Sequence, residues 1–491
     1  MSQGQALVLV SNRGPLEYGR DDDGRRTARR GGGGLVTALD ALAGLTGAVW
    51  VCNAMTDEDR AVAGEHHGAF GAGDGQREYS LRMVSHDADA YQRFYSIVAN
   101  PLLWFVQHYL WDLSNAPDIT TNEVEAFDQG YVVVNQGIAE AAAEEVAARG
   151  GDAIVMVHDY QLYLVPALLR RRCPEAFIHH FVHIPWPQPD AWRVLPARLR
   201  DPLLHGLLSA DVVAFHTEQS ARNFLFGCQD LLDLPVSFAD HSVRVGDRTV
   251  AARWYPISID PTVMEAAAAS PEVLAAEDAL ENIRREHLIV RVDRTDLSKN
   301  ILRGFKAYEQ LLRDHPELTG TVTFLALLQP SRQDVPEYVE YLEKIRRLVA
   351  DINLEFGNAD WQPIDLRIED SITQTIAAYK LFDVLMVNPV FDGLNLVAKE
   401  GMLLNERDGV LILSEHAGVH AELGAFAVSV HPFDIQAQAE ALWQALTMDS
   451  FERGARRQAC VDIISGNDVS KWLQVQLADI ESIGQGQLTL P

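Results

Sequence analysis

Short apolar runs of strand length recur along both halves of this 491-residue chain, and helical patterns separate them. In the first half they cover residues 6–10, 153–157, 178–182 and 211–215. In the second half they cover residues 288–292, 323–328, 366–368, 384–387, 410–413 and 426–430. Strands that alternate with helices in this way predict an α/β fold with two doubly wound, Rossmann-like domains.

The length of the chain also indicates two domains, because single hydrophobic cores rarely grow to this size. We expect residues 1–250 to form an N-terminal domain and residues 251–467 a C-terminal domain. The chain leaves the first domain near Tyr255-Pro256-Ile257, and a final helix over 468–491 is expected to pack back on the first domain. The strand ends of the two domains are expected to face each other across a cleft.

The segment NPVFDGLNLVAKE (388–400) contains the strongest site signal. An apolar run over 381–389 predicts a buried strand, and Asp392-Gly393 predicts a turn into a helix that carries Asn395, Lys399 and Glu400. Free N–H groups at such a helix start can bind phosphate or sugar hydroxyls. An ordinary strand–helix joint would show the same pattern, so this segment by itself does not decide the function.

Polar clusters follow other expected strands. Ser11-Asn12-Arg13, His158-Asp159-Tyr160 and His183-Ile184-Pro185 follow strands of the first half, whereas Arg294, Lys299 and Arg332 follow strands of the second. Each histidine taken singly fits a hydrogen-bonded structural residue. Their common position past a strand end favours a ligand site, and Arg294 with Lys299 suits a pyrophosphate.

Residues 20–30 are expected to form a polar loop, in which the acidic run 21–23 is solvated surface. The glycine run 31–34 is followed by a helical pattern over 35–45, which permits close approach of an anion but lacks dinucleotide spacing. The aromatic-rich stretch 91–111 has helical spacing typical of a core.

A formal net charge of −28 argues strongly against a nucleic-acid partner. No apolar run is long enough to span a membrane, the N-terminus lacks a signal pattern, and four scattered cysteines lack metal or redox spacing. We therefore expect a cytoplasmic protein with small-molecule substrates, no cofactor and no metal.

Several of these motifs occur in order and together resemble the retaining GT-B glycosyltransferases that include trehalose-6-phosphate synthase. They are SNR (11–13), GGL (33–35), HDYQL (158–162), HIPWP (183–187), RVDRTDLSKN (291–300), PSR (330–332) and DGLNLVAKE (392–400). The resemblance covers about residues 6–480. It implies a GT-B fold and transfer of glucose from a nucleotide-glucose to glucose 6-phosphate, giving α,α-trehalose 6-phosphate.

The resemblance also implies roles for individual residues. The donor side comprises Gly34, Arg294, Lys299, Asp392, Gly393, Leu394, Asn395, Leu396, Val397 and Glu400. Within it, Arg294 and Lys299 grip the pyrophosphate, Asp392 to Asn395 hold the sugar hydroxyls, and Glu400 binds the ribose.

The acceptor side comprises Arg13, Tyr95, Trp104, Asp159 and Arg332, with the two arginines on the acceptor phosphate and domain closure completing the site. The group expected to take part in catalysis is Asp159, His183, Arg294, Lys299 and Asp392, with His183 near the anomeric centre and Asp159 orienting the acceptor. No carboxylate pair of a two-step glycosidase is evident. The resemblance implies front-face substitution, in which the leaving phosphate helps to deprotonate the acceptor hydroxyl.

Four residues depart from the usual family pattern. Asn53 stands where an aromatic residue is common, and Leu297, Asn300 and Phe391 differ around the donor side. These departures favour GDP-glucose over UDP-glucose as donor. They also leave open a pseudo-glycosyltransferase that couples aminocyclitols, a glucosylglycerol-phosphate synthase, and a non-catalytic sugar-phosphate sensor. A homo-oligomer also remains open, since subunit association is common in the family.

Overall fold

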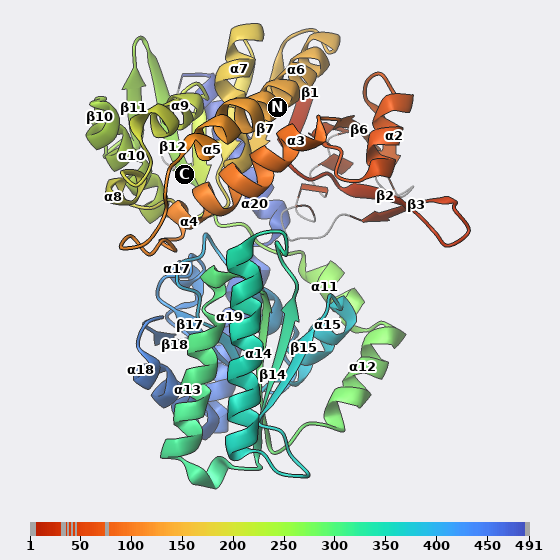
Figure 1. Cartoon of the computed structure of the whole chain (residues 1–491), viewed down its shortest axis with the longest axis vertical. Coiled ribbons are helices and arrows are strands. Elements are labelled where there is room, and N and C mark those ends of the chain that lie inside the picture. Colours follow the sequence, from red (N-terminus) through yellow and green to blue (C-terminus); the bar gives the residue numbers. More distant parts are fainter. Residues whose placement is uncertain are drawn as a thin grey trace. The chain divides into compact units, whose positions relative to one another are not determined.

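The computed structural model describes residues 6–30, 36, 39–40, 43–44, 47–73 and 78–486. The chain forms two compact units (Figure 1). Unit 1 comprises the chain up to Tyr255 together with Trp472 onward, and unit 2 comprises Pro256–Lys471. The chain passes from one unit to the other after Tyr255 and after Lys471, a few residues later than the domain boundaries expected at 250 and 467.

Unit 1 contains a sheet whose central strands are all parallel. Their order across the sheet is β12 (Arg248–Trp254), β9 (Val212–Phe215), β8 (Phe177–Phe181), β7 (Ala153–His158), β1 (Ala6–Ser11), β4 (Val49–Asn53) and β6 (Glu78–Val84). Antiparallel strands β10 (Val236–Ser237) and β11 (Ser242–Val245) extend one edge, and β5 (Phe70–Gly73) extends the other. Strand order reverses between β1 and β7, which is the topological switch point where doubly wound folds bind ligands.

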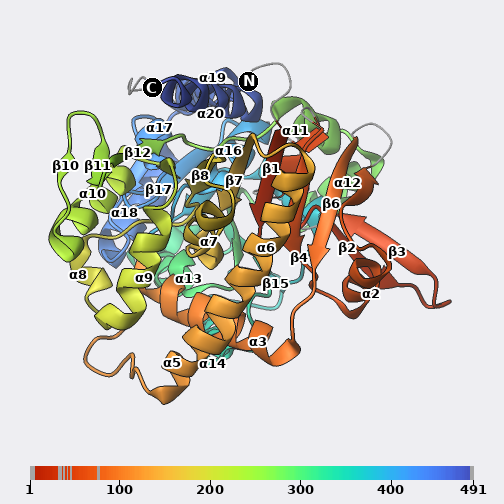
Figure 2. The ribbon, with the colours of Figure 1, turned by 90° about the horizontal axis from the view of Figure 1, so that it is seen from above.

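Helices cover this sheet because its central strands are apolar along their whole length. Every residue of β4 and β7 is buried, as expected for parallel strands packed on both faces. Figure 2 shows α6 (Val132–Ala148) and α7 (Val165–Arg172) lying over these strands. The other helical segments of unit 1 are α2 (Asp57–Glu65), α3 (Ala88–Gln92), the π-helical segment Arg93–Leu103, α4 (Trp104–Gln107), α5 (Thr121–Ala126), the π-helical segment Phe127–Tyr131, the 3-10 turn Tyr160–Leu162, α8 (Pro189–Trp192), α9 (Ala197–Leu207) and α10 (Glu218–Leu232).

The helix that closes the chain, α20 (Val469–Gly484), belongs mostly to unit 1. Its Asp479 accepts hydrogen bonds from the fully buried Arg253 at 3.1 Å and from Tyr255 Oη. The Trp472 ring meets Phe181 edge-on at 5.6 Å. A buried ion pair and a ring contact therefore attach this helix to the end of β12 and to β8.

Unit 2 contains a fully parallel sheet in the order β15 (Ile364–Ile368), β14 (Val322–Gln329), β13 (His287–Arg294), β16 (Val384–Val387), β17 (Val410–Ser414) and β18 (Val428–Val430). The order reverses between β13 and β16, so this sheet repeats the switch-point topology of unit 1. Figure 1 shows α13 (Ile301–Asp314) and α14 (Pro336–Phe356) side by side next to β14. The remaining helices are α11 (Pro261–Ala268), α12 (Pro271–Glu281), α15 (Ile372–Leu381), α16 (Leu396–Leu404), α17 (His420–Leu423), α18 (Ile435–Thr447) and α19 (Ser450–Gly466), with 3-10 turns at Leu297–Lys299 and Pro316–Leu318.

The expected polar loop over 20–30 is wrong. Strands β2 (Leu16–Arg20) and β3 (Arg26–Arg30) form an antiparallel hairpin that closes through the acidic run 21–23. The Glu58 carboxylate on α2 bridges Arg20 and Arg26, whose Nε atoms lie 2.7 and 2.6 Å from it. Cross-strand pairing and this shared carboxylate supply the stability that the polar sequence does not suggest.

The glycine run 31–34, including Gly34, and most of the helix expected over 35–45 lie outside the described residues. In the part of the chain that the structure describes, no helix is both long and apolar enough to cross a membrane.

Candidate active site

Arg294 and Lys299 flank the point where β13 runs into α13. Arg294 is the last residue of β13, and Lys299 ends the short 3-10 turn that precedes α13. Asp296 shapes this turn, because its Oδ1 accepts hydrogen bonds from Ser298 N and Ser298 Oγ, both at 2.9 Å. The turn brings two cations to the switch point of unit 2, as the sequence predicted.

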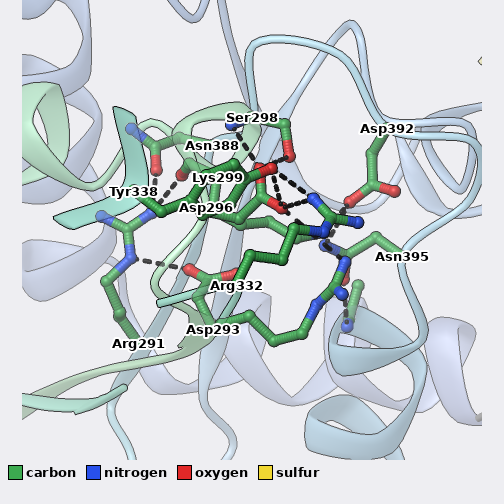
Figure 3. Close-up of polar contacts among 12 residues, drawn as sticks. Arg291, Asp293, Asp296, Ser298, Lys299, Arg332, Tyr338, Asn388, Asp392 and Asn395 are labelled. Atoms are coloured by element: carbon green, nitrogen blue, oxygen red, sulfur yellow. Dashed lines mark hydrogen bonds and ion pairs between the residues drawn. The ribbon is translucent and has the colours of Figure 1, made fainter. Parts of the chain in front are cut away.

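Asp392, from the neighbouring side of the switch point, faces Lys299. Lys299 Nζ lies 2.5 Å from Asp392 Oδ2, and Asn395 Nδ2 donates to the same oxygen at 3.1 Å (Figure 3). Asn395 also caps α16, since its Oδ1 accepts from Ala398 N at 3.2 Å. Both side chains of the ion pair are about 15% exposed, so a ligand can still reach a carboxylate, an ammonium and an amide placed together.

The backbone around Asp392 is held by the loop that follows β17. Gly418 N donates to Asp392 O at 3.0 Å, and Val419 N donates to Leu394 O at 2.9 Å. A Cβ at Gly418 would lie 2.0 Å from Gly393 O, so this close approach requires glycine. Leu396 and Val397 follow as the first half-buried residues of α16.

Arg332 lies on the same side of unit 2, beside Asp296 (Figure 3). Its Nη1 donates to Asp296 Oδ2 at 2.9 Å and to Tyr338 Oη, and Arg294 Nη2 lies 4.0 Å from the same carboxylate oxygen. The Arg332 side chain is 5% exposed, whereas that of Arg294 is 41% exposed. The fully buried carboxylate of Asp296 therefore orients both Arg332 and Arg294. No pattern in the sequence indicated this role.

Arg291 is buried beneath the turn that carries Lys299 and hydrogen-bonds to its backbone. Its fully buried guanidinium donates from Nε to Asp293 Oδ2 at 2.8 Å and from Nη2 to Lys299 O at 2.8 Å and Asn388 Oδ1 at 2.5 Å. A Cβ at Gly304 would lie 2.4 Å from Arg291 Nη1, so glycine leaves room for this arginine. Burial raises the pKa of Asp293, partly offset by Arg291. Arg291 thus fixes the backbone that carries Lys299.

Glu400 and Lys399 differ in role despite being neighbours. Glu400 Oε2 accepts from Tyr379 Oη at 3.1 Å, and burial raises the pKa of its carboxyl, partly offset by this hydrogen bond. Lys399 is fully buried, with Nζ 3.0 Å from Ile257 O and 2.8 Å from Glu422. Lys399 is therefore structural.

The residues that depart from the family pattern are accommodated locally. Asn300 has φ 57° and ψ 34°, a left-handed conformation that glycine and asparagine tolerate best, and its Nδ2 donates to Asn388 O and Pro432 O at 2.9 and 2.7 Å. Phe391 stacks on His416, with ring centroids 4.4 Å apart. Leu297 packs against the core of unit 2.

In unit 1, Arg13 and Asp159 occupy the switch point between β1 and β7. Arg13 is exposed just past β1, and Asp159 follows β7 with φ 77° and ψ 173°. This conformation is essentially a glycine one and is costly for aspartate. Asp159 Oδ1 accepts from His183 N at 3.1 Å, and its own N–H donates to Phe181 O at 2.7 Å. The strained backbone thus links the ends of β7 and β8.

His183 lies between two other histidines. His158 Nδ1 is 3.1 Å from His183 Nε2, and His183 Nδ1 is 3.2 Å from His216 Nε2. Burial holds the pKa of His158 and of His183 well below the ordinary value, and the neighbouring imidazoles lower it further. His216 was missed, although an apolar strand ending in histidine occurs three times in the sequence, at 158, 183 and 216.

The predicted aromatic residues lie on the segments after α3. Trp104 is 5% exposed and stacks on His108 at 4.0 Å, and Tyr95 stacks on Tyr91 at 6.0 Å. Asn53, at the end of β4, donates from Nδ2 to Asn12 Oδ1 at 2.8 Å, and its Oδ1 lies 2.7 Å from His86 Nε2. A polar network therefore occupies the position where an aromatic side chain is common.

The described residues contain no group of three or more His, Cys, Asp or Glu side chains placed to hold a metal ion. The expectation of a reaction without metal or cofactor stays a prediction.

Each of the two units is doubly wound and carries polar groups at its switch point, which is the architecture of the GT-B fold. The family model "Glycosyltransferase family 20" matches residues 5–482, and the chain belongs to this family.

The chain is 33% identical over 486 residues to an alpha,alpha-trehalose-phosphate synthase [UDP-forming] 2 of Aspergillus niger, covering 96% of each chain. It is 30% identical over 485 residues to a validamine 7-phosphate valienyltransferase of Streptomyces hygroscopicus subsp. jinggangensis, covering 96% of this chain and 94% of that one. A crystal structure of an alpha,alpha-trehalose-phosphate synthase (UDP-forming) from Burkholderia vietnamiensis superposes with a TM-score of 0.82 at 30% identity, covering 98% of each chain.

Proposed function

We propose that the protein transfers glucose from a nucleotide-glucose to glucose 6-phosphate with retention of the α configuration, producing α,α-trehalose 6-phosphate. The observation that carries this proposal is the grouping of Arg294, Lys299, Asp392 and Asn395 at the switch point of unit 2. The positive charges of Arg294 and Lys299 can bind a diphosphate, and the adjacent carboxylate and amide can hydrogen-bond sugar hydroxyls.

In the proposed reaction the bond from the anomeric carbon to the diphosphate oxygen breaks, and a bond to the acceptor hydroxyl oxygen forms on the same face. The acceptor proton passes to the departing phosphate. Negative charge grows on the diphosphate, and Arg294 and Lys299 stabilise it in the transition state. Lys299 must loosen its pair with Asp392, which leaves that carboxylate able to accept from sugar hydroxyls.

The acceptor groups proposed in unit 1 are Arg13, Tyr95, Trp104 and Asp159. Asp159 orients the acceptor hydroxyl, because its backbone is held in a strained conformation against His183 N. Arg332 is proposed to contact the acceptor phosphate. Its existing bonds to Asp296 and Tyr338 would pre-organise the guanidinium for that contact.

For the donor base, the UDP-forming relatives favour UDP, whereas the departures of Leu297, Asn300 and Phe391 from the family pattern are the reason to test GDP as well. Incubation of the protein with UDP-, GDP- or ADP-glucose and glucose 6-phosphate, followed by mass spectrometry and NMR of the product, tests both questions. An α,α-linked disaccharide phosphate from one donor supports the proposal, and its absence with all three donors rejects it.

The second candidate is a pseudo-glycosyltransferase that joins two cyclitol units. Two observations favour it: the similarity to a valienyltransferase, and the polar Asn53 network where an aromatic residue is common. Competition between glucose 6-phosphate and an aminocyclitol phosphate, with the matching nucleotide-cyclitol as donor, distinguishes the two. Faster turnover of the cyclitol pair would establish this second function.

A further inference from the structure

Three histidines cross the carboxyl edge of the unit 1 sheet in the same order as the strands that carry them. His158 is the last residue of β7, His183 comes two residues after β8, and His216 directly follows β9. The next strand in the sheet, β12, is followed directly by Tyr255. Because these four parallel strands are neighbours, their ends place three imidazoles and one carbonyl in a row.

The row is hydrogen-bonded throughout. His158 Nδ1 meets His183 Nε2 at 3.1 Å, His183 Nδ1 meets His216 Nε2 at 3.2 Å, and His216 Nδ1 meets Tyr255 O at 3.3 Å. Each link uses the Nδ1 of one imidazole. In such a row every neutral ring must donate through the same nitrogen, either Nδ1 or Nε2. The group at the end of the row decides which nitrogen carries the proton.

The end of the chain is a backbone carbonyl, which can only accept. Tyr255 O also receives Trp472 Nε1–H at 3.1 Å, so both of its acceptor positions are engaged by N–H donors. His216 must therefore carry its proton on Nδ1, which leaves a lone pair on Nε2. That lone pair requires a proton on His183 Nδ1, and the same argument places a proton on His158 Nδ1.

His158, at the other end of the row, supports the same assignment of protons. Within the described residues, His158 Nε2 is buried and has no hydrogen-bond partner. In the direction set by the carbonyl this atom is a bare lone pair, whereas the reverse direction would bury an unpaired N–H and set a lone pair against Tyr255 O. Burial also lowers the pKa of His158 and His183, which keeps these two rings neutral.

We infer that His158 and His216 are positioning residues that hold His183 as the neutral Nδ1–H tautomer, with its Nε2 acting as an acceptor. The functional part rests on the proposed function and on the role that the family resemblance implies for His183, near the anomeric centre. Positive charge develops at that carbon as the glycosidic bond breaks. With both ring nitrogens hydrogen-bonded, the neutral imidazole of His183 is held in one orientation and adds no opposing cation.

The direct test is a ¹⁵N spectrum of the histidine rings in the full chain labelled with [¹⁵N]histidine. Long-range ¹H–¹⁵N correlations distinguish a protonated ring nitrogen from a bare one, and the variants H158Q, H183Q and H216Q assign the signals. We expect Nδ1 protonated and Nε2 bare in all three histidines at neutral pH. A protonated Nε2 at His183, or a mixture of tautomers, would overturn the inference.

A matched pair of variants at His216 tests the link to catalysis. H216Q sets an amide oxygen near the former Nε2 position, where it can accept from His183 Nδ1–H. H216F keeps a ring of similar size but removes the acceptor. We expect H216F to lose the Nδ1–H signature of His183 and to lower kcat about tenfold or more, with the KM for nucleotide-glucose nearly unchanged.

H216Q is expected to keep the His183 signature and to stay within a few-fold of the wild-type kcat. An H216F protein that retains both the signature and kcat contradicts the positioning role, as does an H216Q protein impaired as strongly as H216F. If H216F does not fold, the wild-type spectrum still decides the tautomer. Wild-type protein that shows the expected tautomers but makes no disaccharide phosphate rejects the proposed function and keeps the tautomer assignment.

Discussion

The two switch points of this protein share one topology and carry opposite chemistry. At the unit 2 switch point the side chains are ions: Arg294 and Arg332 share Asp296, and Lys299 pairs with Asp392. At the unit 1 switch point, neutral imidazoles are hydrogen-bonded in a row beside Asp159. The same strand order therefore carries ion pairs in one unit and a row of hydrogen-bonded imidazoles in the other.

The difference follows from how each edge keeps its charges stable. In unit 2 the cations are paired with carboxylates, Lys299 with Asp392 and Arg332 with Asp296. In unit 1 the rings of His158 and His183 hydrogen-bond to other imidazoles, and burial lowers the pKa of both. Four experiments test this contrast.

The largest effect is expected at Arg332. R332A removes a partner of the fully buried Asp296, and breaking such a pair typically costs about 3–5 kcal/mol of the free energy of unfolding. Urea denaturation measures this, and the acceptor KM measured below the unfolding range is expected to rise as well. The control Y338F removes the hydroxyl that donates to Asp296 and accepts from Arg332 but keeps the ion pair between them, and it is expected to cost about 1 kcal/mol. Wild-type stability of R332A would show that Asp296 does not depend on this arginine.

Arg294 is expected to affect the reaction instead of the fold. R294A should lower kcat/KM by about 10²-fold to 10³-fold, roughly 3 kcal/mol, because a preorganised donor to the leaving group is lost. Its side chain is 41% exposed, so unfolding should change little. K306A, an exposed lysine on α13, is the matched control and should keep full turnover. Near wild-type turnover of R294A would remove Arg294 from the donor site.

The pH dependence of stability tests the neutral edge. Burial lowers the pKa of His179 to about 3, and the side chain has no hydrogen-bond partner among the described residues. Below pH 6.5, the ordinary pKa of this histidine, the unfolded chain binds a proton that the folded protein excludes. The free energy of unfolding therefore decreases as the pH is lowered. At pH 5 this amounts to about 2 kcal/mol, at roughly 1.4 kcal/mol per pH unit.

H179F should remove this loss, because phenylalanine keeps a ring beside Phe181 and Tyr255 but takes up no proton. The measurement is the difference in unfolding free energy between pH 7 and pH 5, which should shrink by about 2 kcal/mol relative to the wild type. The exposed control H205Q should leave that difference unchanged. An identical pH dependence in H179F and the wild type would show that His179 titrates normally.

The smallest effect concerns the strained backbone at Asp159. D159G and D159A both lose the carboxylate that accepts from His183 N, but only glycine relieves a φ of 77°. D159G should therefore be about 1–2 kcal/mol more stable than D159A, while both lose most of their activity. Equal stability of the two variants by thermal unfolding would show that the conformation at Asp159 is not strained.

Much of the fold could be predicted from the sequence, because parallel strands buried on both faces are nearly continuous apolar runs. The prediction failed at the hairpin of β2 and β3, whose polar residues are stabilised by Glu58 from a distant helix. Among the site residues, Arg294, Lys299 and Asp392 could be placed because each follows such a run. Asp296 and His216 could not, because their importance depends on which side chains meet them.

The sequence by itself determined the α/β alternation, the two domains, and which polar residues follow each strand. These features are local, since they depend on apolar runs and on the residues next to them. The tertiary structure decided the rest, because hydrogen-bond partners come from strands far apart along the chain. It joined Lys299 to Asp392 and Arg332 to Asp296, and it ended the histidine row at the carbonyl of Tyr255. That carbonyl can only accept a hydrogen bond, and so it sets the tautomer of His183, two hydrogen bonds away.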